Sequence, residues 1–166
     1  MLCLFFDALR DASSVFSCYY VTINYRLIGE TKMTIRTAEL KDFHLIKQYD
    51  KHIAEIEFTN VITLGRIIMI EEEGKFIGWL RYNYFWDNIP FINMLYVLEE
   101  YRGKGYGKKL LENWEQKMKQ LGFHIVLTST QSNEYSQHFY AQFGYTAMGG
   151  FSLGNAPYEI IMSKEL

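Results

Sequence analysis

A basic, glycine-rich stretch, Arg102-Gly103-Lys104-Gly105-Tyr106-Gly107, holds the residue types in this sequence that are best suited to binding a phosphate group. Glycines let backbone N–H groups approach a ligand closely, and Arg102, Lys104 and Lys108 add positive charge. The attraction is strongest where a loop opens a helix, because the first helical turn presents unpaired N–H groups and the positive end of the helix dipole. The stretch therefore predicts a loop for a phosphorylated ligand.

The segments on either side of this loop predict a strand and a helix. Residues 91–97 are apolar or β-prone on both faces, which is typical of a strand buried within a sheet. After the loop, charged residues alternate with apolar residues that recur at helical spacing: Leu110, Leu111, Trp114, Met118 and Leu121. Gly122 is suited to ending this helix.

Other glycine-rich phosphate loops do not fit the spacing. A dinucleotide-binding or kinase-type G-x-G-x-x-G that starts at Gly103 needs a glycine where Lys108 stands. One that starts at Gly105 needs a glycine in place of Leu110. A Walker loop needs Ser or Thr in place of Lys109. All three are excluded.

The pattern R-x-x-G-x-G, followed by an amphipathic helix, resembles the acetyl-CoA-binding motif of the GCN5-related N-acetyltransferase (GNAT) family. The resemblance implies that the loop amides bind the pyrophosphate of CoA and that backbone groups of the preceding strand pair with the pantetheine arm. The residues assigned to the cofactor in this way are Leu95, Tyr96, Val97, Arg102, Gly103, Lys104, Gly105, Tyr106, Gly107 and Lys108.

A second block is similar to the next motif of the same family. Residues 123–129 predict another buried strand, and residues 133–143 predict a helix that Gly144 closes. In the family, an Asn near the start of this helix contacts the cofactor, and a Tyr before the glycine faces the thioester sulfur. The resemblance assigns these roles to Asn133 and Tyr140, with Tyr140 as the catalytic proton donor. A core tyrosine on an amphipathic helix is the alternative for Tyr140.

The sequence does not assign a general base. Many relatives carry a carboxylate on the central strand near the position of Asn93, and an amide cannot accept a proton from an ammonium group. A water relay, Asp87 and Glu159 stay open, although both carboxylates are also typical of surface charges. His138 lies two positions from Tyr140, so on a helix the two side chains point to different faces.

Three functional classes follow from the resemblance. The leading one is an N-acetyltransferase that moves an acetyl group from acetyl-CoA to a primary amine by direct attack on the thioester. Asn93 motivates the second, a CoA-binding regulatory module without turnover. The third is an acyltransferase for a longer acyl-CoA. The acceptor is expected to be a small molecule or a protein or peptide amine.

Composition limits the other classes. A chain of 166 residues, 49% hydrophobic, is long enough for one well-buried domain, and its net charge of −2 argues against a nucleic-acid partner. Two cysteines and four histidines show no metal-ligand spacing, so no metal is expected. Without a secretory signal or a membrane-spanning run, we expect a cytoplasmic protein that does not enter the membrane. The oligomeric state stays open, with a homodimer among the alternatives.

Residues 33–166 predict a single α+β domain of the GNAT type, in which helices flank a mixed, mostly antiparallel, twisted sheet. Residues 1–32 are expected to be an extension upstream of a natural start at Met33, with an added functional strand as the alternative. Further helices are expected at residues 41–53 and 59–65. Further strands are expected at residues 33–38, 66–71, 76–84, 145–148 and 158–163.

Overall fold

A sheet of seven strands forms the centre of the computed structural model, which describes residues 32–166. The strands are β1 (Met33–Thr37), β2 (Ile67–Glu72), β3 (Lys75–Phe85), β4 (Ile89–Val97), β5 (Ile125–Gln131), β6 (Thr146–Phe151) and β7 (Glu159–Glu165). The helices are η1 (Leu40–Asp42), α1 (Phe43–Lys47), α2 (Glu55–Thr63), η2 (Glu99–Tyr101), α3 (Tyr106–Gln120) and α4 (Ser136–Gln142). The predicted extension, residues 1–32, lies outside the described residues except for Lys32.

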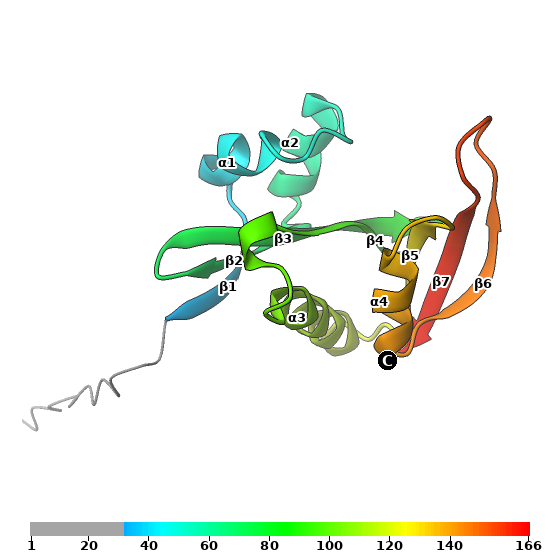
Figure 1. Ribbon diagram of the computed structural model, residues 1–166. Helices are drawn as coiled ribbons and strands as arrows, with labels where there is room; N and C mark the ends of the chain where they lie inside the picture. Colours follow the sequence, from blue (N-terminus) through cyan, green and yellow to red (C-terminus); the bar gives the residue numbers. More distant parts are fainter. Residues whose placement is uncertain (1–31) are drawn as a thin grey trace, which may run out of the picture. The chain divides into compact units, whose positions relative to one another are not determined.

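The strands follow the order β1-β2-β3-β4-β5-β7-β6, and only the β4–β5 pair is parallel. Helices α1 and α2 lie on one side of the sheet, and α3 and α4 lie on the other (Figure 1). The predicted fold, a mixed and mostly antiparallel sheet flanked by helices, is confirmed. None of the helices in residues 32–166 is long and apolar enough to cross a membrane.

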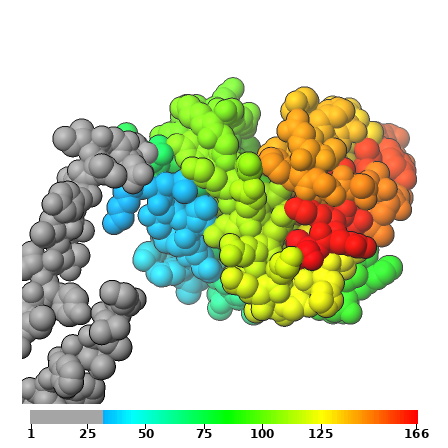
Figure 2. Space-filling model, turned by 90° about the horizontal axis from the view of Figure 1, so that it is seen from below, coloured from blue at the N-terminus to red at the C-terminus, as the bar shows by residue number. Residues whose placement is uncertain are grey.

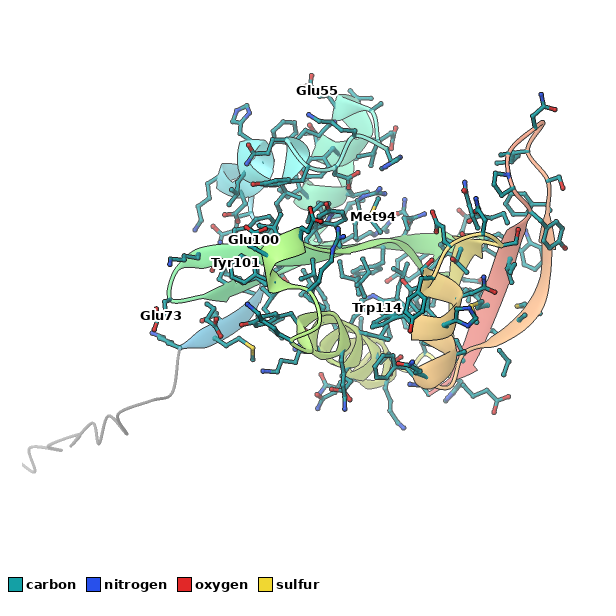
Figure 3. The ribbon with its side chains drawn as sticks, in the orientation of Figure 1. Glu55, Glu73, Met94, Glu100, Tyr101 and Trp114 are labelled. Carbon is teal, nitrogen blue, oxygen red and sulfur yellow. The ribbon has the colours of Figure 1, made fainter. Side chains whose placement is uncertain are left out.

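Helix α3 packs on the sheet through the apolar face that its sequence predicts. Leu110, Leu111, Trp114 and Met118 are fully buried in one core with residues of β2, β3 and β5. Figure 3 shows Trp114 on the side of the sheet that carries α3. Leu121, which we expected on this face, is 59% exposed because the helix has ended at Gln120. The chain then turns at Gly122, whose φ is +88°.

The predicted helix at residues 41–53 is much shorter in the structure. A 3-10 turn leads into α1, which ends at Lys47, and the second helix starts at Glu55 instead of Thr59. Asp50 explains the break, because its buried carboxylate accepts a hydrogen bond from the His52 N–H at 3.3 Å. Such a local side-chain bond stabilises a turn at the expense of a helix.

The strand predicted at residues 145–148 is longer than expected. Strand β6 continues through Gly149 and Gly150, which we placed in a loop, and pairs with β7 as far as Phe151. A Cβ atom at Gly150 would lie 2.1 Å from the carbonyl oxygen of Glu159. Glycine is therefore present because the two strands approach each other closely, and not because the chain turns there.

A β-bulge at Asn93 divides strand β4. Arg81 pairs with Met94 and Tyr82 pairs with Ile92, so Asn93 has no partner on β3. Ile92 and Leu95 both pack in the core under α3, while Met94 packs on the side of α1 and α2 (Figure 3). The extra residue thus resets the alternation of side chains along the strand.

Beyond this bulge, β4 also loses its contact with β5. The parallel ladder consists of two pairs, Phe91 with Leu127 and Ile92 with Thr128. Strands β5, β7 and β6 then turn away from the first four strands (Figure 1). One edge of residues 93–97 is therefore not covered by β5.

A buried ion pair connects the segment between α1 and α2 to the sheet. The Nε atom of Arg81 lies 2.8 Å from Oδ2 of Asp50, and the side chains are 7% and 0% exposed. A buried charge that loses its partner typically costs about 3–5 kcal/mol, because water cannot solvate it. The pair therefore makes the position of the α1–α2 segment depend on β3.

Asp50→Asn keeps a side-chain oxygen for the turn at His52 but removes the charge that faces Arg81. We expect the free energy of unfolding, measured in urea, to fall by about 3 kcal/mol or more. Lys41→Ala is the matched control, since its partner Glu39 and Lys41 itself are 64% and 68% exposed. That change should cost less than about 1 kcal/mol. Equal losses for the two variants would contradict the role given to the buried pair.

Candidate active site

A cleft of about 870 Å³ opens where β4 and β5 separate. One wall is the end of β4, the second is the loop and first turn of α3, and the third is α4. Figure 2 shows a notch on this face between the green segment around η2 and the orange segment of α4. The lining residues include Leu95, Tyr96, Val97, Tyr101, Arg102, Gly103, Gly105, Tyr106, Gly107, Lys108, Glu134, Ser136, Phe139 and Tyr140. The two sequence motifs therefore line the same cleft.

The glycines of the loop serve two different purposes. Gly103 and Gly105 have φ angles of +73° and +82°, and no atom lies within 4 Å of a Cβ built on either of them. Glycine is needed at both positions because the backbone is left-handed there. Gly105 is also the N-cap of α3. Gly107 has ordinary helical geometry, but a Cβ there would lie 3.5 Å from Leu95 and from Phe139. Gly107 thus marks the place where β4 and α4 approach the helix most closely.

The basic side chains of the loop point in different directions. Arg102 lines the cleft, donates from Nε to the carbonyl oxygen of Val97 at 3.0 Å, and lies 5.1 Å from the ring centre of Tyr96. Lys108 also lines the cleft and is half-exposed. Lys104 does not line it, because its Nζ donates to the carbonyl oxygen of Glu100. Two of the three predicted cations therefore face the cleft.

Tyr106 fixes the start of α3 to the sheet. Its hydroxyl donates to Oε2 of Glu72 on β2 at 2.7 Å, and this hydrogen bond raises the pKa of the phenol. The side chain is 7% exposed. Tyr106 was predicted as a cofactor-binding residue, and its buried hydroxyl leaves the backbone N–H as the group with which it can bind a ligand.

Tyr140 is buried at the inner end of the cleft, with 5% of its surface exposed. The pKa of its phenol is raised to about 12, mainly by burial; a hydrogen bond with the Thr128 side chain lowers it, and the charge of Glu134 raises it by a smaller amount. Thr128 in turn donates from Oγ1 to the carbonyl oxygen of Ile92 at 3.3 Å. Since Ile92 and Thr128 form the last pair before β4 and β5 separate, the hydroxyl lies near the point where the cleft begins.

A carboxylate that the sequence analysis did not single out also lines the cleft. Among residues 32–166, Glu134 is the only Asp or Glu in its lining. Its Oε2 accepts hydrogen bonds from Ser136 at 3.0 Å and from Thr130 at 3.4 Å, and the Thr130 and Ser136 hydroxyls also contact each other. In the sequence, only its place beside Asn133 at the start of the helix could have drawn attention to it.

The other polar candidates lie outside the lining of this cleft. Asn133 is exposed in the turn before α4, which begins at Ser136 and not at residue 133 as predicted. Asn93 is exposed at the bulge, and Asp87 is exposed in the β3–β4 turn with a φ of +64°. Glu159 lies on β7 opposite Gln131. Within the described part of the chain, no three His, Cys, Asp or Glu side chains come together as a metal site.

The sequence profile of the acetyltransferase (GNAT) family matches residues 31–145, more than half of the chain. The chain belongs to this family. The resemblance predicted from the two motifs is thus confirmed, and with it the class of enzyme. A comparison with curated proteins gave no match.

Solved structures of the same fold include Ard1 from Thermoplasma volcanium, with a TM-score of 0.71 and 13% identity over 81% of this chain and 97% of that one. PaiA N-acetyltransferase from Thermoplasma acidophilum, in complex with coenzyme A, has a TM-score of 0.67 and 18% identity over 82% and 100%. Naa50 from Arabidopsis thaliana, in complex with the bisubstrate analogue CoA-Ac-MVNAL, has a TM-score of 0.68 and 17% identity over 81% and 99%. Identities this low establish the shared fold alone.

Proposed function

We propose that this protein transfers an acetyl group from acetyl-CoA to a primary amine by direct attack of the amine on the thioester. The observation that carries the proposal is that the glycine-rich opening of α3 and the buried hydroxyl of Tyr140 line one cleft. Proteins with this fold have been solved with coenzyme A and with a bisubstrate analogue of CoA. The acceptor is expected to be a small molecule or a protein or peptide amine.

We place the pyrophosphate of CoA at the start of α3. The first N–H of this helix with an intrahelical partner is that of Lys109, which donates to the carbonyl oxygen of Gly105 at 3.1 Å. The N–H groups of residues 106–108 are therefore free to donate to phosphate oxygens, and the helix dipole favours the negative charge. Arg102 and Lys108 add positive charge at the same wall.

We place the pantetheine arm along the edge of β4 that β5 leaves uncovered. The carbonyl oxygen of Val97 at this edge accepts a hydrogen bond from Arg102. A pantetheine amide that pairs with Val97 replaces this bond, which releases the guanidinium for the phosphates. Arg102 thus exchanges one acceptor for another when the cofactor binds.

In the chemical step, the amine nitrogen attacks the carbonyl carbon, and the C–S bond breaks with its electron pair on sulfur. We assign stabilisation of the oxyanion to backbone N–H groups near Leu95 or Val97. Tyr140 donates a hydrogen bond to the leaving sulfur. A phenol with a pKa of about 12 is a weaker acid than a thiol of about 8.5, so complete proton transfer is uphill by roughly 5 kcal/mol. The phenol therefore has to recover a proton from the attacking amine as it gives its own away.

A CoA-binding regulatory module is the second candidate, because the central strand carries Asn93 in place of a carboxylate. An acyltransferase for a longer acyl-CoA is the third. Release of free thiol from acetyl-CoA, measured across a panel of small amines and peptide N-termini, separates the first two. Turnover supports the acetyltransferase, and CoA binding without turnover of any amine supports the regulatory module. Competition among acyl-CoA chain lengths tests the third.

Gly107→Val should abolish retention of the protein on a CoA matrix, because the added methyl groups fill the narrow space between Leu95 and Phe139. Gly107→Ala is the matched control, since its Cβ makes only ordinary contacts at 3.5 Å. It should retain CoA binding, and circular dichroism should show that both variants fold. A folded Gly107→Val protein that binds CoA like the parent would place the cofactor elsewhere.

Tyr140→Phe should keep the fold and most of the affinity for CoA, because the ring stays buried and only the hydroxyl is lost. We expect kcat to fall by about 10- to 10,000-fold, the range in which general acid catalysis contributes, with water replacing part of the effect. Steady-state kinetics and calorimetric CoA titration measure the two effects. Weakened CoA binding with an unchanged kcat would make Tyr140 a packing residue and the mechanism wrong.

A further inference from the structure

We infer that Glu134 is the general base that takes the proton from the attacking ammonium group. This assignment rests on the proposed function. Transfer to a thioester requires an uncharged amine, and the central strand offers Asn93, which cannot accept a proton. We assign that capacity to a carboxylate in the same cleft, and among the described residues only Glu134 is both acidic and part of the lining.

The geometry leaves one carboxylate oxygen of Glu134 available. Ser136 and Thr130 both donate to Oε2, at 3.0 Å and 3.4 Å, and this holds the side chain against the end of β5. Within residues 32–166, Oε1 accepts no hydrogen bond from a side chain or from the backbone. The carboxylate is thus held by one oxygen and can accept a proton at the other.

Its position suits contact with an acceptor. The connection between β5 and α4 lies at the end of α4 nearer to the layer of α1 and α2, as Figure 1 shows. The glycine-rich loop belongs to the α3 wall of the cleft, whereas Glu134 directly precedes α4. The charge of Glu134 acts on the Tyr140 hydroxyl, whose pKa it raises.

The surroundings of Glu134 contain no second carboxylate that lines the cleft in the described part of the chain. Strand β5 presents Thr130 and Gln131 at this end, and β7 begins with Glu159 opposite Gln131. The titratable or charged side chains lining the cleft with Glu134 are Tyr96, Tyr101, Arg102, Tyr106, Lys108, Tyr135 and Tyr140. Most of these are phenols, and the two cations lie on the loop and the α3 wall.

The protons balance over the cycle. Glu134 takes one proton from the ammonium group, the neutral nitrogen forms the C–N bond, and the C–S bond breaks. Sulfur receives the proton of Tyr140, and the nitrogen's second proton returns the phenolate to phenol. Glu134 then releases its proton to water, so the products are an amide, CoA thiol and one proton. Because a carboxylate is a weaker base than an amine, the neutral amine forms in an uphill step that precedes the attack, and the attack consumes it.

A structural role for Glu134 makes a different prediction. A negative charge just before α4 interacts favourably with the helix dipole, by about 0.3–1 kcal/mol at an exposed position. Loss of that interaction lowers the melting temperature but leaves the kcat of the folded protein unchanged. The effect on kcat therefore separates a base from a helix-stabilising charge.

The test compares Glu134→Gln, Glu134→Asp and the control Glu165→Gln, which removes an exposed carboxylate at the end of β7. For each variant, kcat and KM for the best acceptor amine are measured, together with CoA affinity and melting temperature. Glu134→Gln should lower kcat by about 100-fold or more and keep CoA affinity within about threefold. Glu134→Asp should restore part of the rate, and Glu165→Gln should match the parent.

A Glu134→Gln protein with parental kcat, or a Glu134→Asp protein that is no more active than Glu134→Gln, would overturn the assignment while leaving the acetyltransferase proposal intact. If the parent itself releases no thiol with any amine in the panel, the proposed function fails and the assignment fails with it. The two failures are thus distinguished by the parent alone.

Discussion

The end of the parallel pairing between β4 and β5 is the constraint on which the site depends. After the pair of Ile92 and Thr128 the strands separate, and the bulge at Asn93 resets the alternation of β4 at the same level. The separation leaves an uncovered strand edge that faces the start of α3 on one side and α4 on the other. A continuous ladder would fill this space with backbone hydrogen bonds, and the cleft of about 870 Å³ would not exist.

The side chains around the cleft differ in how deeply they are buried. The fully buried side chains of α3 and the hydrogen bond from Tyr106 to Glu72 fix the helix that follows the glycine-rich loop. On α4, Tyr140 is buried and stays protonated at neutral pH, because burial raises its pKa to about 12. Arg102, in contrast, is exposed and bound by one backbone oxygen, so it can exchange partners. The buried groups thus determine the geometry of the cleft, and we propose that the exposed cation adjusts to the ligand.

The sequence predicted the parts of the fold that follow from local pattern. The motif glycines, the apolar face of α3 and the alternating hairpins depend on neighbours in the chain. The break of the first helix was missed because Asp50, whose carboxylate accepts the His52 N–H, is also held by Arg81, a residue on a distant strand. Side-chain direction was missed for the same reason: Lys104 bonds to the Glu100 backbone, while Glu134, beside the predicted Asn133, lines the cleft. A motif gives the position of a residue in the chain, but tertiary contacts decide which group faces the ligand.

The central claim is that one cleft between β4, α3 and α4 binds acetyl-CoA with its pyrophosphate at the start of α3. Titration of the 15N-labelled protein with CoA tests it most directly. The account predicts that the largest shifts of backbone amide signals fall in residues 95–97 and 103–108, with smaller ones along α4. A second hollow of about 420 Å³, which includes Glu112, Glu115 and Lys164, provides the contrast. Shifts concentrated there, with the signals of residues 103–108 unmoved, would contradict the account.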